Sequence, residues 1–187
     1  MKNIIKFIGG WLYLFAYQVT NWRAHVRALF LGNKRTAGKV TYKGVLTATK
    51  IAKDGSKQEL GILGTRVVTN AAVTFMRDDF NDGASDINLF NFHDSGIGAV
   101  AEAVTDTALG TPAGPARVAG TKSVPASNQY RSVATIAYTA TLAITEHGLF
   151  SASTAGTLWD RTVFAAVNVV NGESIQFTYT LTLTAGG

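Results

Sequence analysis

The pattern of hydrophobic and polar positions is clearest near the C-terminus, where it alternates with a period of two. In the run SIQFTYTLTLT (174–184), isoleucine, phenylalanine, tyrosine and leucine share one face, while glutamine and threonine occupy the other. This is the pattern of a strand with one buried face. Two further runs, VATIAYTATLAIT (133–145) and RTVFAAVNVV (161–170), are equally rich in residues that favour strands. The segment 133–184 is therefore predicted to hold three strands.

Two dipeptides predict tight turns between strands. Asn171-Gly172 predicts a hairpin that joins the last two runs, and Asp54-Gly55 predicts another with arms at 46–52 and 58–68. Gly61 and Gly64 indicate a bulge or a bend in the second arm of that hairpin.

Between these strand-rich regions, one segment has helical spacing. Ala72, Phe75, Met76 and Phe80 fall near one face of a helix. Asn70 is the predicted N-cap, and 81–83 is the predicted end of the helix. Residues 87–92 are then expected to resume a strand that leads into 93.

Taken together, these patterns predict a mainly β protein, an antiparallel β-sandwich with Greek-key or jelly-roll-like connections. The sandwich is expected at 38–187, behind a short helical N-terminal extension at 1–37. The stretch 95–131 holds all three prolines and is predicted to be a long loop, which would wrap another surface, carry a short helix or strand, or form an exposed arm. A brief ordered piece is expected at 99–109. The predicted core residues are Phe75, Ile136, Tyr138, Leu142, Ile144, Leu149, Phe150, Val163, Val167, Phe177, Tyr179 and Leu181.

The N-terminal run FIGGWLYLFAY (7–17) is apolar on all sides. It lacks the cleavage site of a secretory signal, and the uncharged run 7–22 is shorter than a membrane span. A segment buried by protein is the third interpretation, since exposed aromatic residues would aggregate in water and interfaces favour tryptophan and tyrosine. Folding back onto its own domain and anchoring at a membrane surface are the alternatives. The predicted partner interface consists of Trp11, Tyr13, Phe15, Tyr17, Trp22, Arg23, Arg27, Lys34 and Arg35.

Charge is divided unevenly along the chain. Residues 1–66 have a net charge of +10 and residues 67–187 one of −5, within a total of +5. A basic N-terminal third suits an acidic partner protein, nucleic acid or anionic lipid. Part of this positive charge is explained equally well by solvated lysines that prevent strand edges from pairing with other chains. These are Lys39, Lys43, Lys50, Lys53 and Lys57. Nucleic-acid binding has charge alone in its favour.

No motif in the sequence predicts a reaction, so the protein is not expected to be an enzyme or to need a cofactor or metal. The pairs His93-Asp94 and Glu146-His147 are interpreted as turn residues before glycine, because neighbours on a strand point to opposite faces. The four aspartates between 78 and 86 lack calcium-loop spacing and indicate a solvated helix end. Gly96-Ile97-Gly98 lacks the third glycine of a dinucleotide site. A surface ion pair is expected between Glu146 and Arg161.

Several segments together resemble structural proteins of tailed-bacteriophage virions. They are HDSGIGAVAEAVTDTALGTP, RVAGT and YTATLAITEHGLFSASTAGTLWDRTVFAAVNVVNGESIQFTYTLTLT, with VVTNAAVTFMRDDF upstream, and they cover roughly residues 67–184. The resemblance implies a non-enzymatic role in the particle. The aromatic N-terminus is not part of it.

The resulting expectation is a capsid decoration, cement or minor capsid protein, located in the virion and attached through residues 1–37. Its expected partners are the major capsid protein or other virion proteins and further copies of itself. A neck, collar or tail-fibre-attachment protein is the nearest alternative. From another class, a host-surface module could bind carbohydrate through threonine-rich faces and the long loop.

Overall fold

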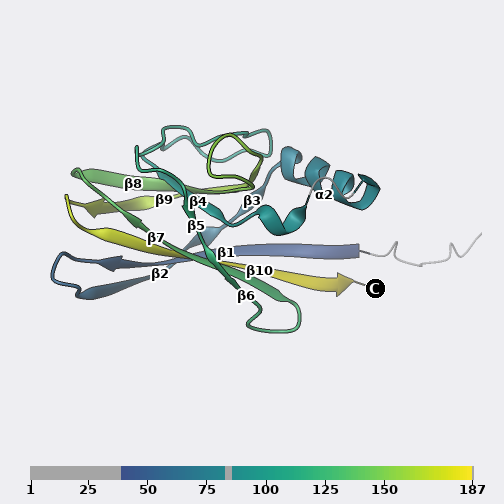
Figure 1. The fold of residues 1–187 in the computed structure, drawn as a ribbon, viewed down its shortest axis with the longest axis horizontal. Coiled ribbons are helices and arrows are strands. Elements are labelled where there is room, and N and C mark those ends of the chain that lie inside the picture. The colour runs from purple at the N-terminus through teal and green to yellow at the C-terminus, as the bar shows by residue number, and fades with distance from the viewer. Residues whose placement is uncertain (1–38, 83–85, 187) are drawn as a thin grey trace, which may run out of the picture. The chain divides into compact units, whose positions relative to one another are not determined.

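The computed structural model describes residues 39–82 and 86–186. Over these ranges the chain is an antiparallel β-sandwich with one α-helix, which confirms the predicted fold class (Figure 1). The chain divides into two units, Met1–Val40 with Ala185–Gly187, and Thr41–Thr184. The helical extension predicted at 1–37 lies outside the described residues.

The first sheet has the strand order β2-β1-β10-β7-β6. Its central strand β10 therefore lies between a strand from the start of the described chain and one from its middle. The bounds are β1 Lys39–Ile51, β2 Lys57–Thr65, β6 Thr121–Ser123, β7 Gln129–Ala137 and β10 Ser174–Gly186.

The second sheet has the order β3-β9-β8-β4-β5. Its two longest strands, β8 and β9, are neighbours, and β4 lies beside β8 (Figure 1). The bounds are β3 Val67–Val68, β4 Phe92–Gly96, β5 Val118–Ala119, β8 Leu142–Phe150 and β9 Leu158–Val169.

The hairpin predicted at Asp54-Gly55 is confirmed. Strands β1 and β2 pair antiparallel around it, and Gly55 has the positive φ of 82° that such a turn needs. The register shifts twice along this pair, on either side of Gly61, whose φ is 70°. The predicted bulge is therefore present.

The hairpin predicted at Asn171-Gly172 is wrong, although the turn itself forms. Gly172 has a φ of 88°, and Glu173 N donates to Val170 O at 3.0 Å. However, β9 belongs to the second sheet and β10 to the first, so the turn carries the chain between sheets. The reason is that the turn binds the end of β7 instead: Gly172 N donates to Tyr138 O, and Tyr138 N donates to Glu173 O.

The run 133–145 is also two strands rather than one. It breaks after β7, and β8 begins at Leu142 in the other sheet. The β7–β8 and β9–β10 connections thus both cross between the sheets, side by side at Tyr138, as connections in a jelly-roll-like sandwich do.

Helix α2 (Asn70–Asp82) forms where helical spacing predicts it. Its N-cap is Thr69 rather than Asn70, because Thr69 Oγ1 accepts from Ala72 N at 3.1 Å. The same hydroxyl donates to Leu158 O at 2.6 Å and ties the helix start to β9. The strand expected at 87–92 is instead a 3₁₀ turn, η1 (Ile87–Leu89), before β4.

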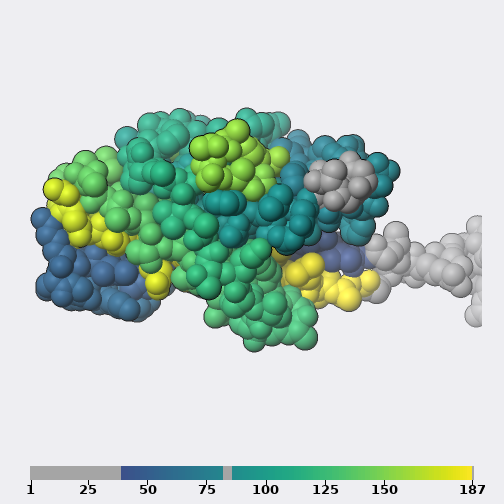
Figure 2. All heavy atoms as spheres, in the orientation of Figure 1, coloured from purple at the N-terminus to yellow at the C-terminus, as the bar shows by residue number. Residues whose placement is uncertain are grey.

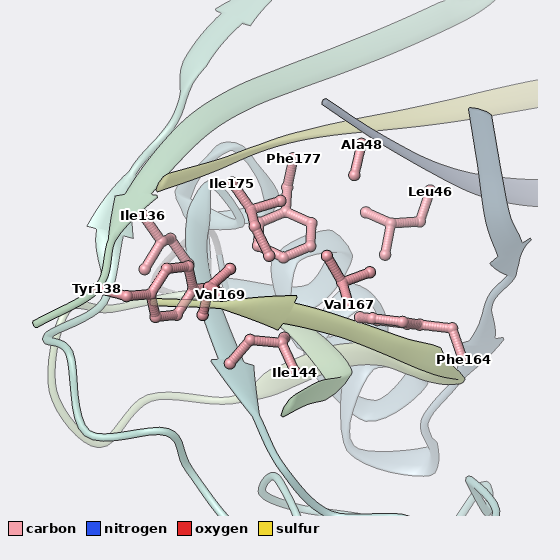
Figure 3. Close-up of a cluster of buried hydrophobic side chains, with 10 residues drawn as sticks. All are labelled: Leu46, Ala48, Ile136, Tyr138, Ile144, Phe164, Val167, Val169, Ile175 and Phe177. Carbon is pink, nitrogen blue, oxygen red and sulfur yellow. The ribbon is translucent and has the colours of Figure 1, made fainter. Parts of the chain in front are cut away.

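The core lies between the two sheets. Figure 3 shows its largest cluster, in which Ile175 and Phe177 of β10 face Val167 and Val169 of β9. A second cluster near α2 includes Ala72, Phe90, Leu149, Trp159, Tyr179 and Leu181. Ten of the twelve predicted core residues belong to or pack against these two clusters, Phe150 belongs to a third, and half-buried Val163 belongs to none.

The long loop predicted at 95–131 carries the two short strands β5 and β6, as one of the three expectations allowed. No regular element occurs within 99–109; that stretch contains a turn in which Asp106 N donates to Ala103 O at 3.0 Å. Residues 98–111 are held against the second sheet by contacts described below, whereas residues 121–128 are exposed and β6 pairs with β7 at the edge of the first sheet.

Candidate functional site

The predicted partner-interface residues, Trp11 through Arg35, all lie outside the described residues, so their placement stays a prediction. Within the described ranges, three features gather polar or exposed side chains: a polar network between the sheets, a clamp on the long loop, and a groove beside α2.

The polar network runs through the middle of the sandwich. Arg66 lies beside the carboxylate of Asp160, and both side chains are fully buried. Arg66 Nη1 also lies 2.8 Å from His147 Nδ1, His147 Nε2 lies 3.0 Å from His93 Nδ1, and His93 Nε2 lies 2.8 Å from Ser132 Oγ. The sheets are therefore joined by hydrogen bonds as well as by apolar contacts.

The direction of these hydrogen bonds follows from arginine, which can only donate. His147 Nδ1 must accept from Arg66, so His147 carries its proton on Nε2 and donates it to His93 Nδ1. His93 then donates from Nε2 to Ser132. Both rings are neutral in this arrangement. Burial, with the charge of Arg66 second, lowers the pKa of His93 to about 3, and burial followed by Arg66 and His93 lowers the pKa of His147.

This network does not offer chemistry to a substrate. His93, His147 and Asp160 are 0% exposed, and no ligand can reach them without separating the sheets. The interpretation of His93-Asp94 and Glu146-His147 as turn residues is wrong, since both pairs lie within strands β4 and β8. The expectation that neighbours point apart is confirmed, since each histidine faces the network while its acidic neighbour binds the long loop.

The clamp consists of Glu146 and Arg161 on the outer side of the second sheet. Both side chains are buried, and Arg161 Nε and Nη2 each lie 2.7 Å from Glu146 Oε2. The ion pair predicted from the sequence is thus present, but it is not a surface pair. The long loop covers it because Arg161 also donates to Asp106 Oδ2 at 2.9 Å and to Val100 O at 3.1 Å.

The Glu146 carboxylate also accepts three backbone hydrogen bonds from the loop, from Gly98, Gly110 and Thr111 at 2.7–3.0 Å. Burial alone would raise the pKa of Glu146, but the hydrogen bonds from Thr111, Gly110 and Arg161 outweigh it and hold this pKa below its usual range. A Cβ at Gly96 or Gly98 would clash with this carboxylate. The Gly-Ile-Gly pattern therefore makes room for Glu146.

The groove opens at the end of the sandwich, between the sheets and under α2, and has a cavity volume of about 500 Å³. Figure 2 shows α2 at this end of the molecule, above the yellow end of β10. Side chains from α2, η1 and both sheets line it: Tyr42, Met76, Asp79, Phe80, Ile87, Asn88, Phe90, Tyr130, Leu149, Trp159, Tyr179, Leu181 and Leu183.

The walls of this groove are largely apolar, and three of its aromatic side chains have their polar atoms engaged within the protein. Trp159 Nε1 donates to Tyr179 Oη at 2.9 Å, and Tyr130 Oη donates to Phe90 O at 2.9 Å. Phe80 stands at the rim with 89% of its surface exposed. Asp79 is the charged residue among the lining side chains. Such a surface suits an apolar or aromatic group attached to something basic.

Helical spacing predicts the face of α2 but not the groove beside it. Phe80 and Ala72 share that predicted face, yet Ala72 is buried and Phe80 is exposed. The face of α2 continues past the edge of the sandwich, and no sequence signal marks that edge. Of the aspartates in the predicted solvated helix end, Asp79 lines this groove.

Residues 39–82 and 86–186 contain no cluster of histidine, cysteine or acidic side chains that could hold a metal ion. In the same part of the chain no helix is long and apolar enough to cross a membrane. Comparisons of the sequence with protein-family models and with curated proteins, and of the fold with solved structures, gave no match.

Proposed function

We propose that this chain is a non-enzymatic structural protein of a tailed-bacteriophage virion, which decorates or cements the capsid and docks through residues 1–37. Both five-stranded sheets are built from strands between Lys39 and Gly186. This architecture supports two separate roles, in which the sandwich is the folded body and the aromatic, basic residues 1–37 are the docking segment. That observation carries the proposal, together with the sequence resemblance over residues 67–184.

The charges support the same division. Residues 1–37 contain six lysines and arginines and no acidic residue, whereas residues 38–187 have a net charge of −1. The segment also carries Trp11, Tyr13, Phe15, Tyr17 and Trp22. Aromatic and arginine anchors of this kind dominate the binding energy of protein interfaces. The rigid body, with its buried clamp and polar network, suits a protein that must keep its shape on a particle.

The test is incorporation into particles. Virions assembled with the full chain and with a chain lacking residues 1–37 are purified, and the amount of this protein is measured against the major capsid protein. The proposal expects the full chain in hundreds of copies and the truncated chain in almost none. Normal incorporation of the truncated chain would refute docking through this segment. A few to about a dozen copies would favour a neck, collar or tail-fibre-attachment protein instead.

A further inference from the structure

We infer that the groove under α2 is the receiving site for the aromatic run 7–22 of a second copy of this chain, so that neighbouring copies are linked by exchanged N-terminal segments. The inference rests on the proposed function in one respect, the docking role of the segment. It adds the surface that receives the segment and the identity of the partner.

The first argument is the chemistry of the groove. Its lining is aromatic and aliphatic, and Phe80 leaves 89% of its surface in water at the rim. An exposed phenylalanine beside an apolar cavity of about 500 Å³ is unfavourable in an isolated molecule. This volume falls within the range of about 300–1,000 Å³ that proteins use to enclose ligands, so it can take a few large side chains.

The second argument is the composition of the segment. Residues 7–22 are uncharged and include Phe7, Trp11, Tyr13, Phe15, Tyr17 and Trp22. A run of this kind needs a protein surface to cover it. Every copy carries one such run and one such groove, and an exchange between copies covers both at once. Closed symmetric assemblies are the usual result of such self-complementary contacts.

The third argument is electrostatic. The run is flanked by Lys2 and Lys6 on one side and by Arg23 and Arg27 on the other. Asp79 lines the groove, and Arg77, the basic residue of α2, is paired with Asp78 rather than with Asp79. Lys122, close by, donates to Asn88 O at 3.0 Å and is held at that carbonyl. Opposite charges at the rim steer the association and set the direction of the bound segment.

The fourth argument is reach. Tyr42 of β1 lines the groove, so the chain enters the described body beside it. Residues 23–38, sixteen in all, separate the run from the start of β1 at Lys39. Sixteen extended residues span up to roughly 50 Å, whereas a domain of this size has a radius of gyration of roughly 15 Å. The run can therefore reach the groove of a neighbouring molecule.

The test uses full-length chains and measures their mass in solution by light scattering. The wild-type chain of 19.8 kDa should have at least twice that mass at micromolar concentration. Phe80→Lys, which removes the apolar contact and puts a charge of the same sign as the flanks of the run at the exposed rim, should be monomeric. So should Trp11→Ser/Phe15→Ser, which weakens the run. Val73→Lys is the matched control, since Val73 is 54% exposed on the same helix but does not line the groove; it should keep the wild-type mass.

Mixing the two defective chains decides between exchange and any other mode of association. One chain keeps an intact run and the other an intact groove, so an equimolar mixture should restore a species of twice the monomer mass. A mixture that stays monomeric overturns the inference, as does a wild-type monomer or a Phe80→Lys chain with unchanged mass. A monomeric wild-type chain that copurifies with a small apolar molecule would show that the groove binds this ligand rather than the run of a second copy.

The outcome is separable from that of the proposed function. A monomeric chain that still enters particles in high copy number overturns exchange and leaves the virion role standing. A chain that passes the mixing test but is absent from purified particles overturns the virion role and leaves exchange standing.

Discussion

At the scale of single residues, this protein places ionisable groups in two very different buried settings. The two histidines are held neutral between the sheets, whereas Glu146 is held as an anion under the long loop. Each setting has a measurable consequence for stability.

Removing the carboxylate from the clamp should be strongly destabilising. Glu146→Ala leaves Arg161 buried without its partner and removes the acceptor for Gly98, Gly110 and Thr111. Breaking a buried pair in this way costs about 3–5 kcal/mol. Urea denaturation of the variant measures the loss, with the exposed Glu59→Ala as a nearly neutral control. A loss as small as that of the control would show that the loop does not depend on Glu146.

The buried histidines should make the protein lose stability in mild acid. Their pKa values are lowered in the folded state, so between pH about 6.5 and the folded pKa the unfolded chain binds more protons. This contribution to the free energy of unfolding is therefore complete above pH about 6.5. It is lost as the pH falls, for His93 down to about 3.

The expected slope is about 1.4 kcal/mol per pH unit for each histidine, or about 2.7 kcal/mol for both. Denaturant unfolding between pH 7.5 and 5 measures this slope at pH values above the usual pKa range of carboxylates. Replacing His93 by glutamine should roughly halve the slope in this window. An equally steep profile in that variant would assign the acid sensitivity to other groups.

At the scale of elements, the start of α2 depends on one hydroxyl. Thr69→Ala removes both the cap on Ala72 N and the hydrogen bond to Leu158 O. The expected cost is about 1–2 kcal/mol, and Thr69→Ser should recover most of it because serine keeps the hydroxyl. The exposed Thr74→Ala in the same helix is the control. Thermal or urea unfolding compares the three variants; equal stability would show that Thr69 is not the effective cap.

The sequence predicts elements well here because strands and helices are local. Alternation predicts β10, and helical spacing predicts α2. Prediction from sequence fails where long-range contacts determine which strands pair. Asn171-Gly172 predicts a turn, but the turn is hydrogen-bonded to Tyr138, and β10 lies in the other sheet from β9.

The candidate site was predictable only in part, for the same reason. The exposed Phe80 and the buried Glu146–Arg161 pair depend on where the sandwich ends and on where the long loop lies. A local sequence pattern predicts neither the exposure of Phe80 nor the burial of this pair. The histidine network joins three strands that are far apart in sequence. The acidic residue next to each histidine favoured a turn interpretation instead.

At the scale of the whole molecule, the sandwich is expected to fold without residues 1–37. Their removal changes the net charge from +5 to −1. The truncated chain should keep the folded β-sheet signal and a cooperative unfolding transition while no longer binding a cation exchanger at neutral pH. Circular dichroism and ion-exchange elution measure the two effects. An unfolded truncated chain would show that the segment belongs to the folded body.

The position of β10 has a consequence for biosynthesis. It lies between β1 and β7 in the first sheet, yet it is the last of the described strands to leave the ribosome. Until then β1 and β7 have no common neighbour, and the second sheet lacks Ile175 and Phe177, two fully buried side chains of the core cluster that joins the sheets. Folding of the body must wait for Ser174–Gly186, whereas the aromatic run 7–22 has emerged long before. Nascent chains on one polysome would therefore expose their aromatic runs to each other before the groove under α2 has formed.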